Sequence, residues 1–299
     1  MEFKAFAKIN WDLHVLGKRS DGFHELDTVM VNVSLFDSLI VEPDSASVTL
    51  TCSDPTLATD DTNLVVRAAK ALKAASGYCG GVKMHLVKRI PMGGGMGGGS
   101  SDAACALRAL NELWDLHWEV SRLQPLAAGL GSDVAFFLYG GWCRCLGRGE
   151  IVEPLKSAST WPDVPILLVL PKLHVPTPQV YKRCSFPAWD GKSGMRGLTD
   201  IEIAISSSLN TIGGGRQRLP LRNDLTAAAV QVESKLVALQ RVLQQREPGR
   251  WLMSGSGAVH FVVGSSADEG ASLCDALKAE TGLEVRVLAA TTAAKCSYK

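Results

Sequence analysis

The chain has 299 residues, with 31 Lys and Arg residues against 30 Asp and Glu residues, which gives a formal net charge of +1. Nucleic-acid binders rely on phosphate contacts and carry a clear basic excess, so this balance argues against that class. A hydrophobic share of 46% is enough to build a core and argues against intrinsic disorder. The length predicts two domains of roughly 150 residues each.

The first fifteen residues alternate between two faces with period two. Apolar residues occupy the odd positions from Phe3 to Val15, whereas Lys8, Asn10 and Asp12 share the other face. This period predicts a strand with one buried face, long enough to need a bend or a bulge. Taken alone, polar residues at this spacing are typical of a solvated face.

The next elements of the N-terminal half are predicted from caps, breakers and apolar runs. They are a turn at Ser20–Gly22, strands at Thr28–Leu35, Ser38–Val41 and Ser47–Cys52, a helix at Leu64–Ala75 between Asn63 and Gly77, a strand at Val82–Ile90, a helix that starts at Ser100–Asp102, a helix at Ser121–Leu130 and an apolar run at Val134–Leu138.

The segment Pro154–Pro165 is the best linker candidate, and it divides the chain into an N-terminal domain, residues 1–155, and a C-terminal domain, residues 156–299. The second domain is predicted to contain a strand at Ile166–Leu170, an irregular insertion at Phe186–Leu219, a helix at Leu225–Gln245, strands at Trp251–Ser254 and Val259–Val263, a helix at Ala267–Thr281 and a strand at Glu284–Ala289. These elements indicate an α+β fold in which the C-terminal layer has its own core.

Eight cysteines are present, without a CxxC pair and without a His and Cys cluster at zinc spacing, so no metal site is predicted. The N-terminus shows no apolar signal region, and the most apolar run, Ile166–Leu170, is far shorter than a membrane span. We therefore expect a cytoplasmic protein with reduced thiols and no membrane partner.

Glycine is over-represented, with 29 residues against about 21 in an average chain of this length. Six glycines lie between Gly93 and Gly99, after a predicted strand and before a predicted helix. Glycine lets backbone N–H groups turn toward a ligand, and the positive end of a helix dipole favours an anion, so a nucleotide phosphate is the expected ligand. The candidate phosphate-binding residues are Pro91, Met92, Gly93, Gly94, Gly95, Met96, Gly97, Gly98, Gly99, Ser100 and Ser101, with the two serine hydroxyls placed to bond phosphate oxygens or a metal-bound water.

Three other interpretations of this loop compete with a phosphate site on the residues alone. A Walker A loop is excluded because no lysine stands at the required position. A Rossmann fingerprint is formally present in Gly93, Gly95 and Gly98, but the region Asp115–Glu119 shows no second strand. A flexible loop without a ligand stays open, although an ordinary strand-to-helix turn needs only one or two glycines.

The glycine loop, followed by an Ala-rich helix, resembles the phosphate loop of the GHMP kinase superfamily. Other segments are similar to the family of GHMP kinases that phosphorylates a CDP-linked methylerythritol: Ala7–Asn10, Asp21–Leu26, Gly131–Phe137, Pro176–Tyr181, Asn223–Leu225 and Ser254–Gly257. The chain departs from the pattern at Ala135 and His260, and its segment Phe186–Leu219 is longer than expected, which leaves the outer wall of the substrate site open.

The resemblance implies a two-domain GHMP kinase fold, with a ribosomal-protein-S5-domain-2-like N-terminal domain and a ferredoxin-like C-terminal α/β layer. It implies transfer of the ATP γ-phosphate to the 2-hydroxyl of 4-diphosphocytidyl-2-C-methyl-D-erythritol, in non-mevalonate isoprenoid precursor biosynthesis. Lys8 and Asp133 are the implied catalytic pair. The implied substrate-binding residues are Asn10, Phe23, His24, Leu26, Met30, Thr177 and Tyr181. Mg²⁺ is expected as the companion of ATP, and the expected assembly is a monomer or a weak homodimer.

Each assignment competes with a purely structural one. Asp133 precedes an apolar run as a helix N-cap does, Phe23 and His24 fit a hairpin turn with an apolar residue tucked beneath it, and Gly255–Gly257 fits a tight turn. A neighbouring lysine weakens a carboxylate as a base, but a loose phosphoryl-transfer transition state asks little of the nucleophile. Asp133 is therefore interpreted mainly as a positioning acceptor.

The alternative functions are another GHMP kinase of the homoserine or mevalonate type, a nucleotide-binding module without catalysis, and a Rossmann dehydrogenase. The Asp21–His24 segment argues against the first, because a cytidine site needs an aromatic ring and a partner for the base edge. The presence of both Lys8 and Asp133 argues against the second.

Overall fold

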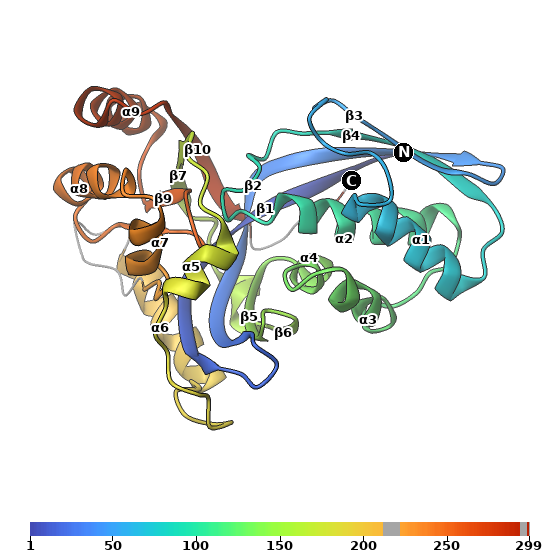
Figure 1. The fold of residues 1–299 in the computed structure, drawn as a ribbon, viewed down its shortest axis with the longest axis horizontal. Helices are drawn as coiled ribbons and strands as arrows, with labels where there is room; N and C mark the ends of the chain where they lie inside the picture. The colour runs from blue at the N-terminus through green and yellow to red at the C-terminus, as the bar shows by residue number, and fades with distance from the viewer. Residues whose placement is uncertain (212–221, 294–297, 299) are drawn as a thin grey trace.

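The computed structural model describes residues 1–211, 222–293 and 298. Within them, strands from both halves of the chain join in one continuous sheet, with the order β3-β4-β2-β10-β7-β9-β8 (Figure 1). Strands β1 and β5 also pair with β2, and β6 pairs with β5. The strands are β1 (Glu2–Lys18), β2 (His24–Asp44), β3 (Val48–Cys52), β4 (Gly81–Val87), β5 (Trp142–Gly147), β6 (Ile151–Pro154), β7 (Pro165–Pro171), β8 (Trp251–Met253), β9 (His260–Val263) and β10 (Val285–Ala293).

Four helices cover one face of the N-terminal part of the sheet (Figure 1). They are α1 (Leu64–Ser76), α2 (Gly98–Leu113), α3 (Val120–Leu130) and α4 (Val134–Tyr139). The predicted caps of α1 are confirmed, since the Asn63 side chain accepts a hydrogen bond from Val65 N and Gly77 ends the helix at φ 71°. Helix α2 begins two residues before the predicted start at Ser100.

Apart from the helical segments between β7 and α8, the C-terminal part has the order of elements β7-α8-β8-β9-α9-β10 and the antiparallel strand order β10-β7-β9-β8. The last strand thus lies beside the first, as in the ferredoxin-like βαββαβ arrangement that was predicted. Helices α8 (Leu236–Arg246) and α9 (Ala267–Thr281) pack on one face of these strands, around Leu167, Val169 and Val262. The α+β fold is confirmed.

The two halves share a core on the opposite face of the C-terminal strands. Trp11 and Val29 of the first two strands pack there with Leu168 and Phe261, and the Trp11 and Phe261 rings stack at 6.0 Å. Strand β10 also pairs with β2. The N-terminal strands are therefore fixed rigidly against the C-terminal layer.

Several predicted boundaries are wrong. The segment expected to be irregular contains α6 (Leu198–Thr211), and the expected linker contains the 3₁₀ helix η1 (Lys156–Thr160), whose Ala158 is buried in the shared core. The helix expected at Leu225–Gln245 is two helices, α7 (Thr226–Val232) and α8, and the two strands expected between residues 28 and 41 are one, β2. Helix α5 (Thr177–Arg183) was not predicted. Gly213–Gly215 lie outside the described residues.

Strand β1 is interrupted by three register shifts against β2, at Phe6/Lys8, Asn10/Asp12 and Val15/Gly17. The predicted bulge is therefore present more than once. Between the first two shifts both faces of the strand are buried, and Lys8, Asn10 and Asp12 are 3%, 1% and 8% exposed. The interpretation of these residues as a solvated face is wrong, because Asp133, Thr28 and Arg196 bind their side chains and enclose them.

Among the described residues, no helix combines the length and the apolar character that a membrane span requires. The seven cysteines in the described part of the chain form no disulfide with one another, and Cys296 lies outside it.

Candidate active site

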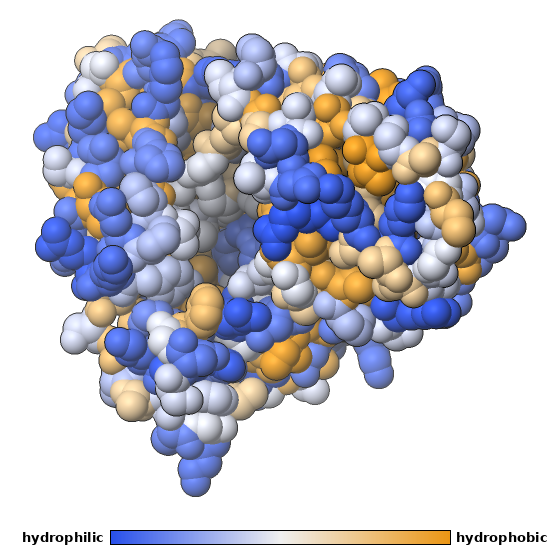
Figure 2. All heavy atoms as spheres, turned by 45° about the vertical axis from the view of Figure 1, so that its right-hand side comes forward, coloured by the Kyte–Doolittle hydropathy of each residue, from blue (hydrophilic) through white to orange (hydrophobic). Residues whose placement is uncertain are grey.

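A cavity of about 650 Å³ is lined by residues from both halves of the chain, and Figure 2 shows the surface hollowed between two lobes. All of the predicted substrate residues line this cavity, together with the predicted catalytic pair: Lys8, Asn10, Phe23, His24, Leu26, Met30, Asp133, Thr177 and Tyr181. They come from β1, the turn between β1 and β2, β2, the loop before α4 and helix α5. The fold thus brings together residues that are separated by up to 173 positions.

The Lys8 ammonium lies 3.5 Å from the Asp133 carboxylate and donates a hydrogen bond of 2.6 Å to the Asn10 amide oxygen. Asp133 occupies the N-cap position of α4, but its side chain makes no capping hydrogen bond, and 27% of it is exposed. The carboxylate is therefore free to face the cavity. Of the two interpretations of Asp133, the structure does not support the helix cap.

Asn10 is held by hydrogen bonds on three sides. Its Nδ2 donates to Thr28 Oγ1 at 2.9 Å, and its backbone N–H donates to Ser254 Oγ at 3.3 Å. The Ser254 hydroxyl in turn donates to the Gly95 carbonyl at 3.1 Å. Asn10, whose side-chain oxygen accepts the hydrogen bond from Lys8, is thereby linked through Ser254 to both glycine-rich segments of the chain.

The hairpin between β1 and β2 places aromatic residues at one end of the cavity. Phe23 is 50% exposed, so it is not tucked beneath the turn, and the Arg148 guanidinium lies 4.8 Å from its ring centre. His24 stacks on Tyr181 with ring centres 4.9 Å apart and an angle of 29°. Burial lowers the pKa of His24, and the nearby charge of Lys18 lowers it further. His24 is therefore a neutral imidazole at pH 7, with one donor and one acceptor nitrogen.

The C-terminal glycine segment forms the opposite wall. Gly255 and Ser256 line the cavity, and the Ser256 hydroxyl is 2.6 Å from the Thr177 hydroxyl of α5. Asn223 Nδ2 donates to the Met253 and Gly255 carbonyls at 2.7 and 2.8 Å, which fixes the segment from behind. The segment is a turn between β8 and β9 and also a wall of the cavity.

The glycine loop requires glycine at several positions. Gly93, Gly95 and Gly97 have φ of 69°, 79° and 69°. A Cβ on Gly95 would overlap the Ser254 carbonyl oxygen, and one on Gly97 would lie 2.8 Å from the Phe137 ring. Gly95 and Gly97 line the cavity. The loop thus leads directly into α2, whose first amides lack intrahelical acceptors and favour an anion.

The two serines of the loop differ. The Ser101 hydroxyl donates to the Phe6 carbonyl at 2.7 Å and Ser101 is buried, so the expectation that it faces a phosphate is wrong in this arrangement. Ser100 is partly exposed in the first turn of α2. Of the two hydroxyls, the one on Ser100 remains available to an anion.

A buried ion cluster lies beneath this helix start. The Lys88 ammonium pairs with Asp37 and also with Asp102, the latter at 2.7 Å, while Asp102 Oδ1 has no hydrogen-bond partner. Burial raises the pKa of Asp102 to about 7, although Lys88 opposes the change. No group of three His, Cys, Asp or Glu residues that could hold a metal occurs in the part of the chain that the structure describes.

Sequence reasoning missed several cavity residues. They are Leu13, Lys18, Gly22, Ser132, Arg148, Pro178, Lys182 and Leu225. Lys18 and Lys182 are exposed and Arg148 is partly exposed, so the cavity carries several cations besides Lys8. Arg148 lies between Gly147 and Gly149, a spacing typical of a turn. It was missed because strands β5 and β6, which this turn connects, were not predicted.

Comparison with known proteins gives consistent matches over the whole chain. The family model of the GHMP kinases N terminal domain matches residues 63–141. A 4-diphosphocytidyl-2-C-methyl-D-erythritol kinase from Synechococcus sp. (strain CC9902) is 39% identical over 98% of this chain and 95% of its own length. One from Chromobacterium violaceum is 41% identical over 89% of this chain and 87% of its own length.

Solved structures agree with these relatives. A homoserine kinase from Cytophaga hutchinsonii (TM-score 0.66, 17% identity, 97% of this chain and 94% of that one) and a mevalonate kinase from Methanococcus jannaschii (TM-score 0.65, 12% identity, 98% of each chain) share the fold alone. A crystal structure of a 4-(cytidine 5'-diphospho)-2C-methyl-D-erythritol kinase has a TM-score of 0.77 at 35% identity and covers 98% of this chain and 99% of its own. The chain belongs to the 4-diphosphocytidyl-2-C-methyl-D-erythritol kinase family of the GHMP kinases.

Proposed function

We propose that this protein transfers the γ-phosphate of ATP to the 2-hydroxyl of 4-diphosphocytidyl-2-C-methyl-D-erythritol. It is an ATP-dependent small-molecule kinase of isoprenoid precursor biosynthesis, as its relatives indicate. The observation that carries the proposal is the shared cavity, which places the Lys8 and Asp133 pair between the aromatic hairpin and the glycine loop.

Asp133 orients the 2-hydroxyl and accepts its proton, because its carboxylate is free of capping bonds and faces the cavity. Lys8 holds the carboxylate and offsets negative charge that develops on the transferred phosphoryl group. Asn10 fixes the Lys8 ammonium through the 2.6 Å hydrogen bond. A loose transition state needs little activation of the nucleophile, so positioning accounts for most of the contribution of these residues.

The hairpin end of the cavity binds the cytidine part of the substrate. Phe23 offers an exposed ring for stacking, and His24, held against Tyr181, offers a donor and an acceptor to the edge of the base. Thr177 borders the remaining space, and Leu26 and Met30 close it near the methylerythritol. The charges of Lys18, Lys182 and Arg148, which line the same cavity, offset those of the diphosphate.

The glycine loop cradles the ATP phosphates. The left-handed glycines and the first amides of α2 fit an anion, with Ser100 as the side-chain donor. ATP supplies the phosphoryl group, and we propose that Mg²⁺ binds mainly through the phosphate oxygens.

We propose a division of the chain between residues 155 and 156, with the substrate held between the two parts. A monomer or weak homodimer in the cytoplasm is proposed with it. Light scattering on the purified protein tests the assembly, and cell fractionation tests the location.

A coupled assay of ATP consumption tests the function. We expect 4-diphosphocytidyl-2-C-methyl-D-erythritol to accelerate ATP consumption, and mevalonate and homoserine to leave it at the background rate. Acceleration by mevalonate or homoserine instead would contradict the proposed substrate. ATP binding without turnover on any of the three would indicate a nucleotide-binding module.

A further inference from the structure

The segment before α6, to which the sequence assigned no role, is bound to the end of β1. Lys18 N donates to the Pro187 carbonyl at 2.8 Å, and Trp189 N donates to the Lys18 carbonyl at 2.9 Å. Gly17 permits this approach, since a Cβ there would lie 2.9 Å from the Pro187 oxygen and from Trp189. The segment is therefore built against the strand that carries Lys8 and Asn10.

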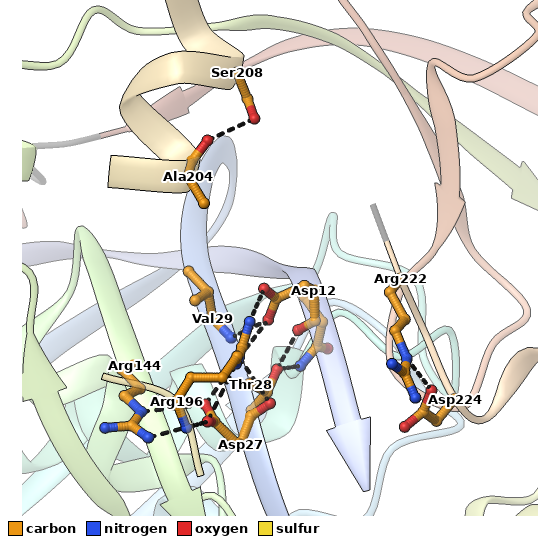
Figure 3. Close-up of polar contacts among 11 residues, drawn as sticks. Asp12, Asp27, Thr28, Val29, Arg144, Arg196, Ala204, Ser208, Arg222 and Asp224 are labelled. Atoms are coloured by element: carbon orange, nitrogen blue, oxygen red, sulfur yellow. Dashed lines mark hydrogen bonds and ion pairs between the residues drawn. The ribbon is translucent and has the colours of Figure 1, made fainter. Parts of the chain in front are cut away.

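Arg196 of this segment reaches two buried carboxylates, as Figure 3 shows. Its guanidinium donates to Asp12 at 2.7 and 3.2 Å and to Asp27 at 2.9 and 3.2 Å. Arg144 of β5 holds the same Asp27 from the other side, at 3.0 and 3.1 Å. Burial would raise the pKa of Asp27, but hydrogen bonds from Arg144 and Arg196 outweigh it and lower the pKa to about 2. Asp27 thus presents a charge that Arg144 and Arg196 satisfy together.

Asp12 lies at the register shift that follows Asn10. Trp11 is the extra residue there, since Asn10 faces Met30 and Asp12 faces Val29. The Asp12 carboxylate accepts the Val29 N–H at 3.0 Å, so a side chain completes the pairing that the bulge interrupts. Bulges redirect side chains near active sites. Arg196 binds the bulge at Trp11 through the carboxylate of the adjacent Asp12.

A continuous set of hydrogen bonds leads from the bulge to the catalytic pair. Thr28 Oγ1 donates to the Asp12 carbonyl at 2.5 Å and accepts from Asn10 Nδ2 at 2.9 Å. Asn10 then accepts from the Lys8 ammonium at 2.6 Å, and this ammonium is 3.5 Å from Asp133. Displacement of the bulge would therefore be transmitted to Lys8 through direct contacts.

We infer that Arg196 is a positioning residue for phosphoryl transfer: by binding Asp12 and Asp27 it fixes the bulge at Trp11, and through Thr28 and Asn10 it fixes Lys8 opposite Asp133. Buried ion pairs add little net stability, because desolvation offsets the attraction, but they can impose one geometry. A misplacement of about 1 Å at reacting groups can lower the rate about 100-fold. The inference rests on the proposed function for its kinetic part only.

The test compares Arg196→Gln with Arg222→Gln. Arg222 pairs with Asp224 close to the same strand, but 61% of its side chain is exposed and it does not contact the bulge. We expect Arg196→Gln to lower kcat by roughly 10- to 100-fold, with the Kd for CDP within twofold of wild type, because the cytidine end of the cavity is unchanged. Arg196→Lys should recover part of kcat, and Arg222→Gln should retain all of it.

A kcat within twofold of wild type in Arg196→Gln would overturn the inference. So would a parallel loss of kcat and of CDP affinity in proportion to the unfolded fraction, because that result indicates a structural role alone. Hydrogen exchange gives a readout that needs no substrate: amides of residues 9–13 should exchange faster in Arg196→Gln than in Arg222→Gln. An inactive wild-type protein would contradict the proposed function. Equal hydrogen exchange of residues 9–13 in Arg196→Gln and Arg222→Gln would contradict the role of Arg196 independently of activity.

Thr28 provides a second variant if Arg196→Gln does not fold. Thr28→Val removes the hydroxyl that joins Asn10 to Asp12, whereas Thr28→Ser keeps it. We expect kcat to fall at least 10-fold in Thr28→Val and to stay within about threefold of wild type in Thr28→Ser. Equal activity of the two variants would overturn the inference.

Discussion

The Lys8 ammonium lies 3.5 Å from the Asp133 carboxylate, although the two residues come from the first strand and from the start of α4. The pair is asymmetric, since Lys8 is buried while 27% of the Asp133 side chain is exposed. Lys8 is thereby fixed from behind by Asn10, and Asp133 is left facing the cavity. The carboxylate is the member of the pair that a substrate hydroxyl can reach.

Asp133→Asn tests this relationship. The amide keeps the size of the side chain but cannot take up the proton, so kcat should fall by roughly 10²–10⁴ while the Kd for ATP stays the same. Asp115→Asn, which changes a carboxylate that is 89% exposed on the surface, should leave kcat unchanged. Near wild-type turnover in Asp133→Asn would remove Asp133 from the mechanism.

The lowered pKa of His24 predicts a pH dependence of binding. Burial, and then the charge of Lys18, shift this pKa below its ordinary value of 6.5, so the imidazole is neutral at pH 7 and becomes charged only at lower pH. Protonation removes the acceptor nitrogen, and the lost hydrogen bond is worth about 1 kcal/mol. The affinity for cytidine should therefore be constant above pH 7 and fall roughly fivefold as the pH drops through the lowered pKa.

Calorimetric titration of cytidine between pH 5 and pH 8 checks this dependence, because cytidine carries no phosphate that titrates in this range. His24→Gln keeps a donor and an acceptor but has no titration, and its affinity should not vary with pH. An equal pH dependence in the variant and the wild type would show that another group is responsible.

Gly95→Ala tests the geometry of the glycine loop. Gly95 has φ 79°, and a Cβ would overlap the Ser254 carbonyl oxygen, so the variant should lose at least about 1–2 kcal/mol of stability. Gly99→Ala is the matched control, since the nearest atom to its Cβ is Leu64 Cδ1 at 3.9 Å and the residue is helical. Urea denaturation should show loss in Gly95→Ala and a gain of about 0.5–1 kcal/mol in Gly99→Ala. Similar stability of both variants would contradict the close approach.

The cluster beneath α2 predicts a pH-dependent stability. Burial disfavours the charged form of Asp102, and its cationic partner, Lys88, is shared with the Asp37 carboxylate, so Asp102 keeps its proton. Its pKa rises from 3.8 to about 7 on folding. Between these values the folded state holds one proton more than the unfolded chain, so stability falls as pH rises.

Asp102→Asn should remove this contribution. Urea denaturation at several values between pH 5 and pH 8 should show the unfolding free energy of wild type falling relative to the variant, by up to about 1.4 kcal/mol per pH unit below pH 7. Parallel curves for the two proteins would mean that Asp102 is ionised in the folded state throughout.

Local signals in the sequence predicted some elements closely. The caps Asn63 and Gly77 give α1 within one residue, and the helix predicted at Ala267–Thr281 is α9 at its observed bounds. In the structure a capping box of Ser266 and Glu269 begins α9. Such signals depend on neighbours within one helical turn. The cavity residues were predicted from the resemblance to the GHMP kinases. The period-two spacing of Lys8 and Asn10 alone predicted that their side chains face solvent.

Features that depend on distant contacts were not predictable in this way. Arg196 stands in a segment rich in Gly, Ser and Arg, and only the folded chain shows that it meets Asp12 and Asp27. Helix α6 was missed because the composition around it is typical of loops, although Ile201 and Ile205 bury one face of it in the shared core. Burial of β1 on both faces likewise requires the C-terminal layer.

The central claim is that the cavity phosphorylates the 2-hydroxyl of 4-diphosphocytidyl-2-C-methyl-D-erythritol. The most direct measurement is ³¹P nuclear magnetic resonance of the products formed from this compound, ATP and Mg²⁺. The account predicts a new phosphomonoester signal without three-bond coupling to hydrogen, because the 2-carbon of the methylerythritol carries a methyl group and no hydrogen. This signal should form in equal amount with ADP and be absent with Asp133→Asn. ADP without a new monoester, or a monoester at another position, would contradict it.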